Sequence, residues 1–285
     1  MPVSPSPRSH ALSPSAIAAA LRDAGCVFAE DEARLLAAAA RTPARLAAMV
    51  AQRVSGRPLE HVIGRAEFCG LRIAVDPGVF VPRRRTEFLA RQAVSLARRA
   101  AAPDGRPIPS RSGAPAVVDL CCGSGAVGVT VATELGRAEL HAADIDPAAV
   151  RCARRNVVPL GGRVYEGDLY DALPSTLRGR VDVLIANVPY VPTAAVALLP
   201  PEARLHEPRT ALDGGADGLD LLRRVAARAP EWLAPGGHLL VETGDDQAPA
   251  AVAACDRSGL TARAAASDDH QATVIIATRP GASPD

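Results

Sequence analysis

Seven short apolar runs of strand length are separated mostly by segments of helical periodicity along the C-terminal part of this chain. They span residues 116–120, 139–144, 162–166, 181–187, 237–243, 260–266 and 273–278. Strands that alternate with helices form a mostly parallel sheet, because each crossover helix packs back onto a face of that sheet. The last two runs have no helix between them and should form an antiparallel pair at one edge. The sequence therefore predicts an α/β fold with a seven-stranded sheet and ligands at the carboxyl ends of its strands.

The N-terminal part predicts a second, smaller unit. Three short helices are expected, starting at Ser15, at about Glu30, and at Pro43 with Thr42 as the N-cap. Apolar residues alternate around Gly70 and predict a hairpin. Residues 102–115 are rich in Pro, Gly and Ser, which is typical of a flexible surface loop. The predicted divisions are a disordered N-terminus (1–13), a helical domain (14–62), a hairpin connector (63–79) and the main domain (80–285).

Charge and composition exclude several kinds of protein. All 32 basic residues are Arg, and with 31 acidic residues the net charge is +1, which argues against extended nucleic-acid binding. The six cysteines form no C-x-x-C pair and have no zinc-like spacing with the histidines, so we expect no metal and a reducing compartment. No signal-peptide core or membrane-length apolar run is present, so a cytoplasmic protein without membrane contact is predicted.

The stretch VVDLCCGSGAVGVTVATEL predicts a strand, a Gly-rich turn and a helix. Backbone N–H groups at such a helix start can approach a ligand closely. Asp144 ends the next strand about 20 residues later, where a carboxylate can accept both ribose hydroxyls of an adenosine-bearing cofactor. Asp146 and Pro147 then read as the N-cap and first residue of the following helix. The candidate cofactor residues here are Asp119, Cys121, Cys122, Gly123, Ser124, Gly125, Asp144 and Ile145.

This turn departs from the dinucleotide pattern G-x-G-x-x-G because Cys121 stands at its first position. It resembles instead the first motif of class I S-adenosylmethionine-dependent methyltransferases. The resemblance implies the Rossmann-like fold of that class and S-adenosyl-L-methionine as the cofactor. The segment EGDLYDAL places Asp168 and Leu169 where such enzymes place their adenine contacts.

The stretch LIANVPYVP carries the candidate catalytic residues. Asn187 ends the fourth strand, so its amide is expected to face the cofactor pocket. Its side-chain carbonyl and the backbone carbonyl of Val188 can accept both hydrogens of a planar NH2 group and aim the nitrogen lone pair at a methyl donor. Pro189 stiffens the turn and Tyr190 can pack against the substrate. The stretch is close to the Asn-Pro-Pro-Tyr of amino methyltransferases; the alternative is that Asn187 merely caps a strand-to-loop turn.

Two further segments, HEPRTALDGGADGLDLL and GRPLEHVIGRAEFCGLRIAV, are similar to the HemK/PrmC family of protein-(glutamine-N5) methyltransferases. The resemblance implies a protein substrate that bears a glutamine, such as a peptide chain release factor, whose amide meets residues 187–190. It covers residues 15–250. Three departures suggest a divergent branch: Val188, the junction PRRRTE where the family usually has Pro-Arg-Pro-Glu-Thr-Glu, and the segment 266–280, which we expect to alter one edge of the pocket.

The junction makes Arg83, Arg84 and Arg85 candidate substrate-binding residues, together with Pro189 and Tyr190. Cations at a helix start are unfavourable with the helix dipole, so the three Arg residues either meet an anionic partner or form a solvated surface. A small-molecule methyltransferase would fit them if its substrate were anionic, and a nucleic-acid amino methyltransferase is the other alternative. A fold retained only for binding is disfavoured because both Asp144 and Asn187 are present. No residue stands out as a general base.

Overall fold

A computed structural model describes residues 13–100 and 113–281. The disorder predicted for residues 1–13 and the loop predicted at 102–115 fall outside this range, except for the last residue of the first segment and the last three of the second. Ser13 does not belong to a disordered segment, because its hydroxyl accepts a hydrogen bond from the Ala16 N–H at 3.2 Å and caps the first helix. The described residues contain no helix long and apolar enough to cross a membrane.

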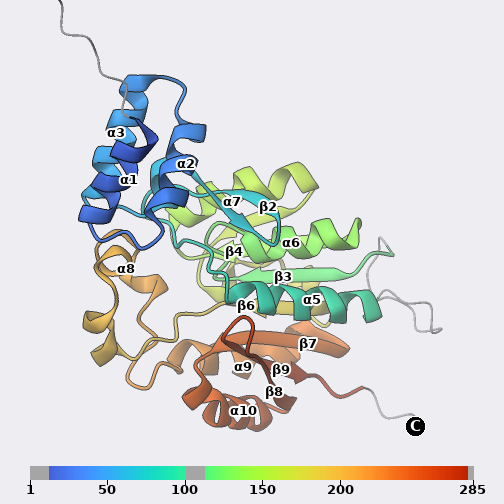
Figure 1. Ribbon diagram of the computed structural model, residues 1–285. Helices are drawn as coiled ribbons and strands as arrows, with labels where there is room; N and C mark the ends of the chain where they lie inside the picture. The colour runs from blue at the N-terminus through green and yellow to red at the C-terminus, as the bar shows by residue number, and fades with distance from the viewer. Residues whose placement is uncertain (1–12, 101–112, 282–285) are drawn as a thin grey trace, which may run out of the picture.

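A seven-stranded sheet forms the centre of the main domain, in the order β5-β4-β3-β6-β7-β9-β8 (Figure 1). Its strands are β3 (Ala116–Leu120), β4 (Glu139–Asp144), β5 (Arg163–Glu166), β6 (Val181–Ala186), β7 (Leu233–Thr243), β8 (Thr261–Ser267) and β9 (Ala272–Thr278). The strands β3 to β7 pair in parallel, whereas β9 runs antiparallel to both β7 and β8. The predicted fold class and the antiparallel edge pair are confirmed.

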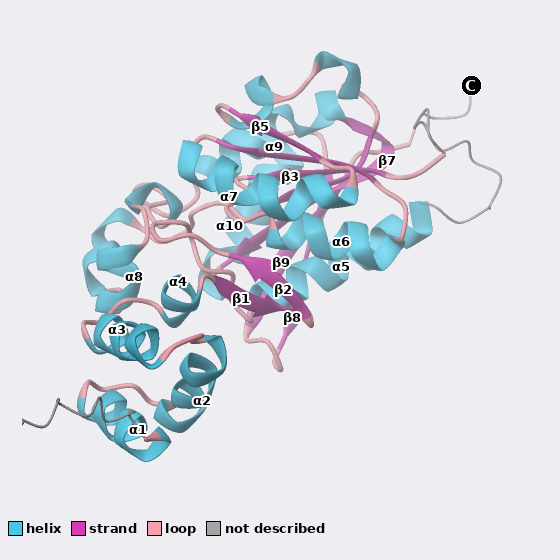
Figure 2. Ribbon diagram, turned by 90° about the horizontal axis from the view of Figure 1, so that it is seen from above, coloured by secondary structure: helices cyan, strands magenta, loops and turns pink. Residues whose placement is uncertain are grey.

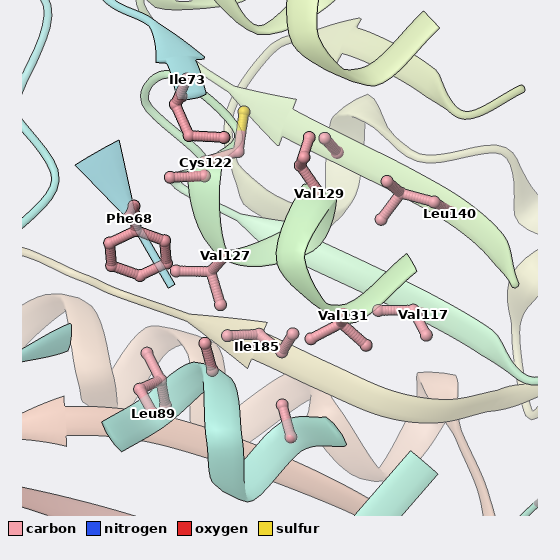
Figure 3. Close-up of a cluster of buried hydrophobic side chains, with 14 of the residues drawn as sticks. Phe68, Ile73, Leu89, Val117, Cys122, Val127, Val129, Val131, Leu140 and Ile185 are labelled. Atoms are coloured by element: carbon pink, nitrogen blue, oxygen red, sulfur yellow. The ribbon is translucent and has the colours of Figure 1, made fainter. Parts of the chain in front are cut away.

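Alternate residues of the central strands build two separate cores, because successive side chains of a strand point to opposite faces. Val117 and Ile185 face the first core with α5 (Thr86–Ala100), α6 (Ala126–Leu135) and α7 (Pro147–Val157). Figure 3 draws part of this core. Val118 and Leu184 face the second core with α9 (Asp220–Trp232) and α10 (Ala248–Arg257). The helices therefore cover both faces, as the alternation of strands and helices predicted.

The N-terminal helices are α1 (Pro14–Asp23), α2 (Ala29–Ala39), α3 (Pro43–Val54) and α4 (Leu59–Ile63). They have their own apolar core, which includes Leu21, Leu36 and Met49. Thr42 caps α3 as predicted, and its hydroxyl accepts from the Arg45 N–H at 3.1 Å. The prediction of three helices is wrong by one: α4 has five residues, too few to show a helical period, and follows Pro58 directly.

A two-stranded hairpin joins the helices to the main domain, as Figure 2 shows from above. It consists of β1 (Arg65–Phe68) and β2 (Leu71–Ala74), with Cys69 and Gly70 in the left-handed region that a two-residue hairpin turn requires. Phe68 belongs to the first core of the main domain, so the predicted connector is packed against the sheet domain.

Short elements complete the described chain between the longer helices and strands. They are the helix α8 (Pro201–His206) and the 3-10 turns η1 (Val158–Leu160), η2 (Leu169–Ala172), η3 (Ser175–Leu177), η4 (Thr193–Leu198), η5 (Arg209–Ala211) and η6 (Asp245–Gln247). α8 lies beside the N-terminal helices in both views (Figures 1 and 2), and Arg53 of α3 forms an ion pair of 3.4 Å with Glu202. This contact joins the helical unit to the segment of the main domain beside it.

Candidate active site

A cavity of about 650 Å³ lies at the carboxyl ends of β3, β4 and β6. Its walls include the turn after β3, residues 144–146 after β4, and residues 187–191 after β6. Residues of the 79–86 and 199–212 segments close the remaining sides. The strand order reverses at β3, so this is the crevice where open α/β sheets bind ligands. A volume of this size is sufficient for a nucleoside-sized ligand and a substrate side chain.

Asp144 organises the Gly-rich turn from the neighbouring strand. One carboxylate oxygen, Oδ2, accepts from the Gly123 N–H at 2.8 Å, and Oδ1 accepts from the Asp146 N–H at 2.9 Å. Burial raises the pKa of Asp144. Asp146 in turn caps α7 by accepting from the Ala148 N–H at 2.8 Å, as predicted. Each oxygen of Asp144 keeps a second lone pair, so the carboxylate can still accept hydroxyl donors from a ligand in the cavity.

Asn156, one of only two Asn residues in the chain, supports the same turn from the other side. Its Nδ2 donates to the Ser124 carbonyl at 2.8 Å and to the Ala74 carbonyl at 2.9 Å, while its Oδ1 accepts from the Ala74 N–H at 3.0 Å. The turn is therefore tied to the hairpin through a single side chain, a role that the sequence analysis did not find.

Asp119 lies at the inner wall of the cavity and is only 2% exposed. Its Oδ2 accepts from the Gly128 N–H of α6 at 2.9 Å, so it supports the first turns of that helix as well as lining the pocket. Burial raises the pKa of Asp119 to about 7.

We expect the substitution Asp119→Asn to flatten the pH dependence of stability. The folded-state pKa of about 7 exceeds the unfolded value of about 3.9, so the contribution of Asp119 to stability is complete below about pH 4 and is lost as the pH rises through 7. Asn keeps an acceptor for Gly128 and cannot ionise. Thermal unfolding should be measured for both proteins between about pH 5 and pH 8. We expect the melting temperature of the native protein to fall relative to that of the variant as the pH rises. Parallel curves would contradict this expectation.

The two neighbouring cysteines of the turn are free thiols, as are the other four. Cys122 is buried and Cys121 is half-buried with a positive φ of 53°. Burial raises the pKa of both thiols, which keeps them neutral. No group of three or more His, Cys, Asp and Glu side chains suited to a metal ion occurs among the described residues.

The remaining cofactor candidates do not all line the cavity. Ile145 lines the cavity and is 60% exposed, and Gly125 is the left-handed N-cap of α6. Asp168 and Leu169 are not among the described residues that line the cavity. The Asp168 carboxylate instead forms an ion pair of 2.6 Å with Arg224 of α9, and Leu169 packs in the second core.

Asn187 follows β6 directly and lines the cavity. Its Oδ1 is buried and has no hydrogen-bond partner among the described residues. A buried acceptor without a donor is unfavourable, so this oxygen favours a ligand N–H at this position. The following Val188 and Pro189 are buried, and Tyr190 donates its hydroxyl hydrogen to Glu242 Oε1 at 3.0 Å. Burial raises the pKa of Tyr190, so it is no base near neutral pH.

The backbone of the 187–190 turn rests on the glycines of the LDGGADGLD segment. A Cβ atom at Gly214 would lie 2.6 Å from the Pro189 carbonyl oxygen, and one at Gly218 would lie 2.2 Å from the Tyr190 carbonyl oxygen. Gln247 completes the support, because its Nε2 donates to the same Tyr190 oxygen at 2.9 Å. Glycine is required at both positions because the two backbones approach each other closely.

The substitution Gly214→Ala should therefore move the 187–190 turn rather than the Gly-rich turn that follows β3. We expect kcat/KM to fall by about 100-fold, since a displacement of about 1 Å at a reacting group has an effect of that size. Binding of S-adenosylhomocysteine, measured by calorimetry, should remain within about two-fold of the native value. Gly136→Ala is the control for backbone strain away from the site, because Gly136 has a φ of 70° that Ala rarely adopts and lies at the end of α6, outside the described residues that line the cavity. Equal losses in the two variants would contradict the support role of Gly214.

The three Arg residues of the junction separate in the structure. Arg83 donates to both carboxylate oxygens of Glu207 at 2.6 Å, and Glu207 Oε1 also accepts from the Val81 N–H at 3.1 Å. Arg85 lies with its Nε 3.1 Å from Glu242 Oε1. Arg84 is exposed and is not among the described residues of the cavity wall. The expected cluster of three is thus reduced to two residues at the cavity, because successive side chains at the start of α5 point in different directions.

The cavity wall differs from the sequence-based prediction in two further ways. Several cavity-lining residues, including Thr86, Leu199 and Glu202, were missed, because short helices and turns carry no periodicity that marks them. The divergent C-terminal segment was expected to alter the pocket, but no described residue from 260 to 281 lines the cavity. It forms β8 and β9 at the far edge of the sheet instead.

Fold and site together define a class I methyltransferase. The crystal structure of a methyltransferase from Pyrococcus furiosus is similar in fold, with a TM-score of 0.53 at 15% identity over 74% of this chain and 90% of the other. The family model described as methyltransferase small domain matches residues 108–213.

Two curated relatives indicate the family within this class. The chain is 38% identical to the release factor glutamine methyltransferase of Geobacter sulfurreducens over 84% of its length and 80% of the relative. It is also 38% identical, over 72% of its length and 67% of the relative, to a 4-amino-L-phenylalanine/4-methylamino-L-phenylalanine methyltransferase of Streptomyces pristinaespiralis. The chain belongs to the release factor glutamine methyltransferase family, as its motifs indicated, and it is a methyltransferase.

Proposed function

We propose that this protein transfers a methyl group from S-adenosyl-L-methionine to the side-chain amide nitrogen of a glutamine in a protein, with a peptide chain release factor as the first candidate. The observation that carries the proposal is the position of Asn187. Its buried, unpartnered Oδ1 lies in the same cavity as the strand-end carboxylate Asp144. The family relation to release factor glutamine methyltransferases supports the same substrate class.

The cofactor side of the cavity suits S-adenosylmethionine. Asp144 offers free lone pairs for the two ribose hydroxyls, and the glycines of the turn allow backbone to come close to the ligand. Ile145 offers an exposed apolar surface at the same wall, which is suited to the adenine ring. When bound, S-adenosylmethionine supplies an activated methyl group on a positively charged sulfur.

The substrate side acts by orientation and electrostatics. An amide nitrogen is a weak nucleophile because its lone pair is delocalised into the carbonyl. Asn187 Oδ1 and the Val188 carbonyl would accept its two hydrogens, which fixes the plane of the amide and stabilises the positive charge that develops on nitrogen. Tyr190, held by Glu242, would pack against the flat amide. After the transfer, the extra proton on the methylated nitrogen would pass to water. Tyr190 would not serve as the base, because burial raises the pKa of its hydroxyl group.

A second candidate is the aromatic amino group of a small amino acid. The relative that is named a 4-amino-L-phenylalanine methyltransferase matches this chain at the same identity as the release factor enzyme. The acceptor pair of Asn187 and Val188 would suit any planar NH2 group, so the pair by itself does not separate the two substrates.

The deciding experiment uses methyl-labelled S-adenosylmethionine with the purified protein. Parallel reactions contain a release factor with a Gly-Gly-Gln sequence, 4-amino-L-phenylalanine, or a nucleic acid, and mass spectrometry locates the label. We expect label on a glutamine nitrogen. Label only on 4-amino-L-phenylalanine would establish the second candidate, and label only on nucleic acid would contradict both.

A further inference from the structure

We propose that Arg85 determines substrate specificity by binding a carboxylate that the substrate carries close to the methylated amino group. In a protein, this carboxylate is the side chain of an Asp or Glu that flanks the glutamine. The inference rests on the proposed function, in which Asn187 binds the NH2 group of the substrate. It adds a binding site for a carboxylate near that NH2 group.

Arg83 and Arg85 both line the cavity, but only the Arg85 guanidinium leaves all of its donors without a hydrogen bond to a described residue. Arg83 donates from one terminal nitrogen to both oxygens of Glu207, whose side chain is fully buried. Arg84 is not among the described residues of the cavity wall. The Arg85 guanidinium makes no hydrogen bond to any described residue, although its Nε lies 3.1 Å from Glu242 Oε1. Its side chain is 38% exposed, so its terminal nitrogens remain open to a ligand.

The guanidinium is also placed next to the reacting group. Its central carbon lies 5.5 Å from the centroid of the Tyr190 ring, the ring proposed to pack on the substrate amide. Tyr190 follows Asn187 by three residues in a turn stiffened by Pro189 and fixed by Gln247. Arg85 and Asn187 both line the cavity, so a substrate whose amide reaches Asn187 lies in the same cavity as the guanidinium.

A second polar group marks the same wall. The Thr86 side chain lines the cavity, is 2% exposed, and has a hydroxyl without a hydrogen-bond partner among the described residues. A planar guanidinium with free terminal nitrogens binds a carboxylate through two parallel N–H···O bonds, and the Thr86 hydroxyl is a further unused donor in the same cavity.

Arg85 also has a structural role that a test has to separate. Glu242 is 1% exposed and receives the Tyr190 hydroxyl, and a buried carboxylate without a nearby cation is strongly destabilising. Arg85→Lys keeps the charge beside Glu242 and removes the two-pronged geometry, whereas Arg85→Gln removes both. Arg84→Gln is the matched control, since it removes an adjacent and exposed guanidinium.

The experiment measures equilibrium binding of three peptides by calorimetry in the presence of S-adenosylhomocysteine. The peptides share a Gly-Gly-Gln sequence and differ only in the residue that follows the glutamine, which is Glu, Ala or Lys. We expect the native protein to bind the Glu peptide about 10-fold more tightly than the Lys peptide, the size of one charge-assisted hydrogen bond. The preference should persist in Arg84→Gln, shrink in Arg85→Lys and vanish in Arg85→Gln, with folding checked by circular dichroism.

Small amino acids give an independent comparison on the same proteins. 4-Amino-L-phenylalanine and its methyl ester differ in the carboxylate alone, so a preference for the acid that depends on Arg85 would support the proposal with the carboxylate coming from a free amino acid. No preference for the anion in either series, or a preference that survives Arg85→Gln, would overturn it. Absence of methyl transfer to any glutamine would count against the proposed function only, because these measurements do not require turnover.

Discussion

The substitution Asn187→Ala is expected to abolish most of the turnover, with a fall in kcat/KM of about 10²- to 10³-fold. Removal of one preorganised hydrogen-bond partner of a developing charge has an effect of that size in other enzymes. The remaining Val188 carbonyl can hold only one of the two amide hydrogens, so the lone pair is no longer aimed at the methyl donor. Steady-state kinetics with methyl-labelled cofactor measure the loss. Near-normal turnover would remove the catalytic argument for Asn187.

Asn156→Ala is the control for this prediction, because it replaces the only other Asn of the chain. Asn156 makes three hydrogen bonds between the hairpin and the Gly-rich turn. Its loss should lower the free energy of unfolding by about 1 to 3 kcal/mol, while Asn187→Ala should leave thermal unfolding almost unchanged. The two variants thus separate support of the fold from action on the substrate.

The substitution Asp144→Ala is expected to weaken S-adenosylmethionine binding by about 100-fold. Two hydrogen bonds from ribose hydroxyls to a charged acceptor would be lost, each worth about 1.5 to 3 kcal/mol when measured singly. The Gly123 and Asp146 N–H groups also lose their acceptor, so the turn that approaches the cofactor becomes less defined. Calorimetric titration with S-adenosylhomocysteine measures the change directly.

Glu166→Ala provides the matched control for Asp144. Glu166 lies opposite Asp144 in the pairing of β4 with β5, is exposed, and is not among the described residues of the cavity wall. We expect its substitution to leave the dissociation constant within about two-fold. Similar losses for the two variants would mean that a general electrostatic effect, rather than ligand contact, underlies the role of Asp144.

Local patterns determined the framework of this protein. The five apolar runs from 116 to 243 each became a parallel strand, although β7 begins at Leu233 rather than at residue 237. Turn and cap chemistry located Thr42, Asp146 and the hairpin around Gly70, because those signals depend only on neighbouring residues. Parallel strands end at a common edge, so the order of elements also brought Asp144 and Asn187 into one cavity.

Only the tertiary structure decided which neighbouring residues of one type differ in role. Three consecutive arginines read alike in sequence, yet Arg83 is bound to Glu207, Arg84 is exposed, and Arg85 lies at the cavity. The directions of Arg83 and Arg85 depend on partners more than 100 residues away in the chain. Gly214 also owes its role to a contact between separate segments, because the carbonyl of Pro189 leaves no room for a side chain there. Local periodicity fixes where strands begin and end, whereas contacts between distant segments fix where a given side chain points.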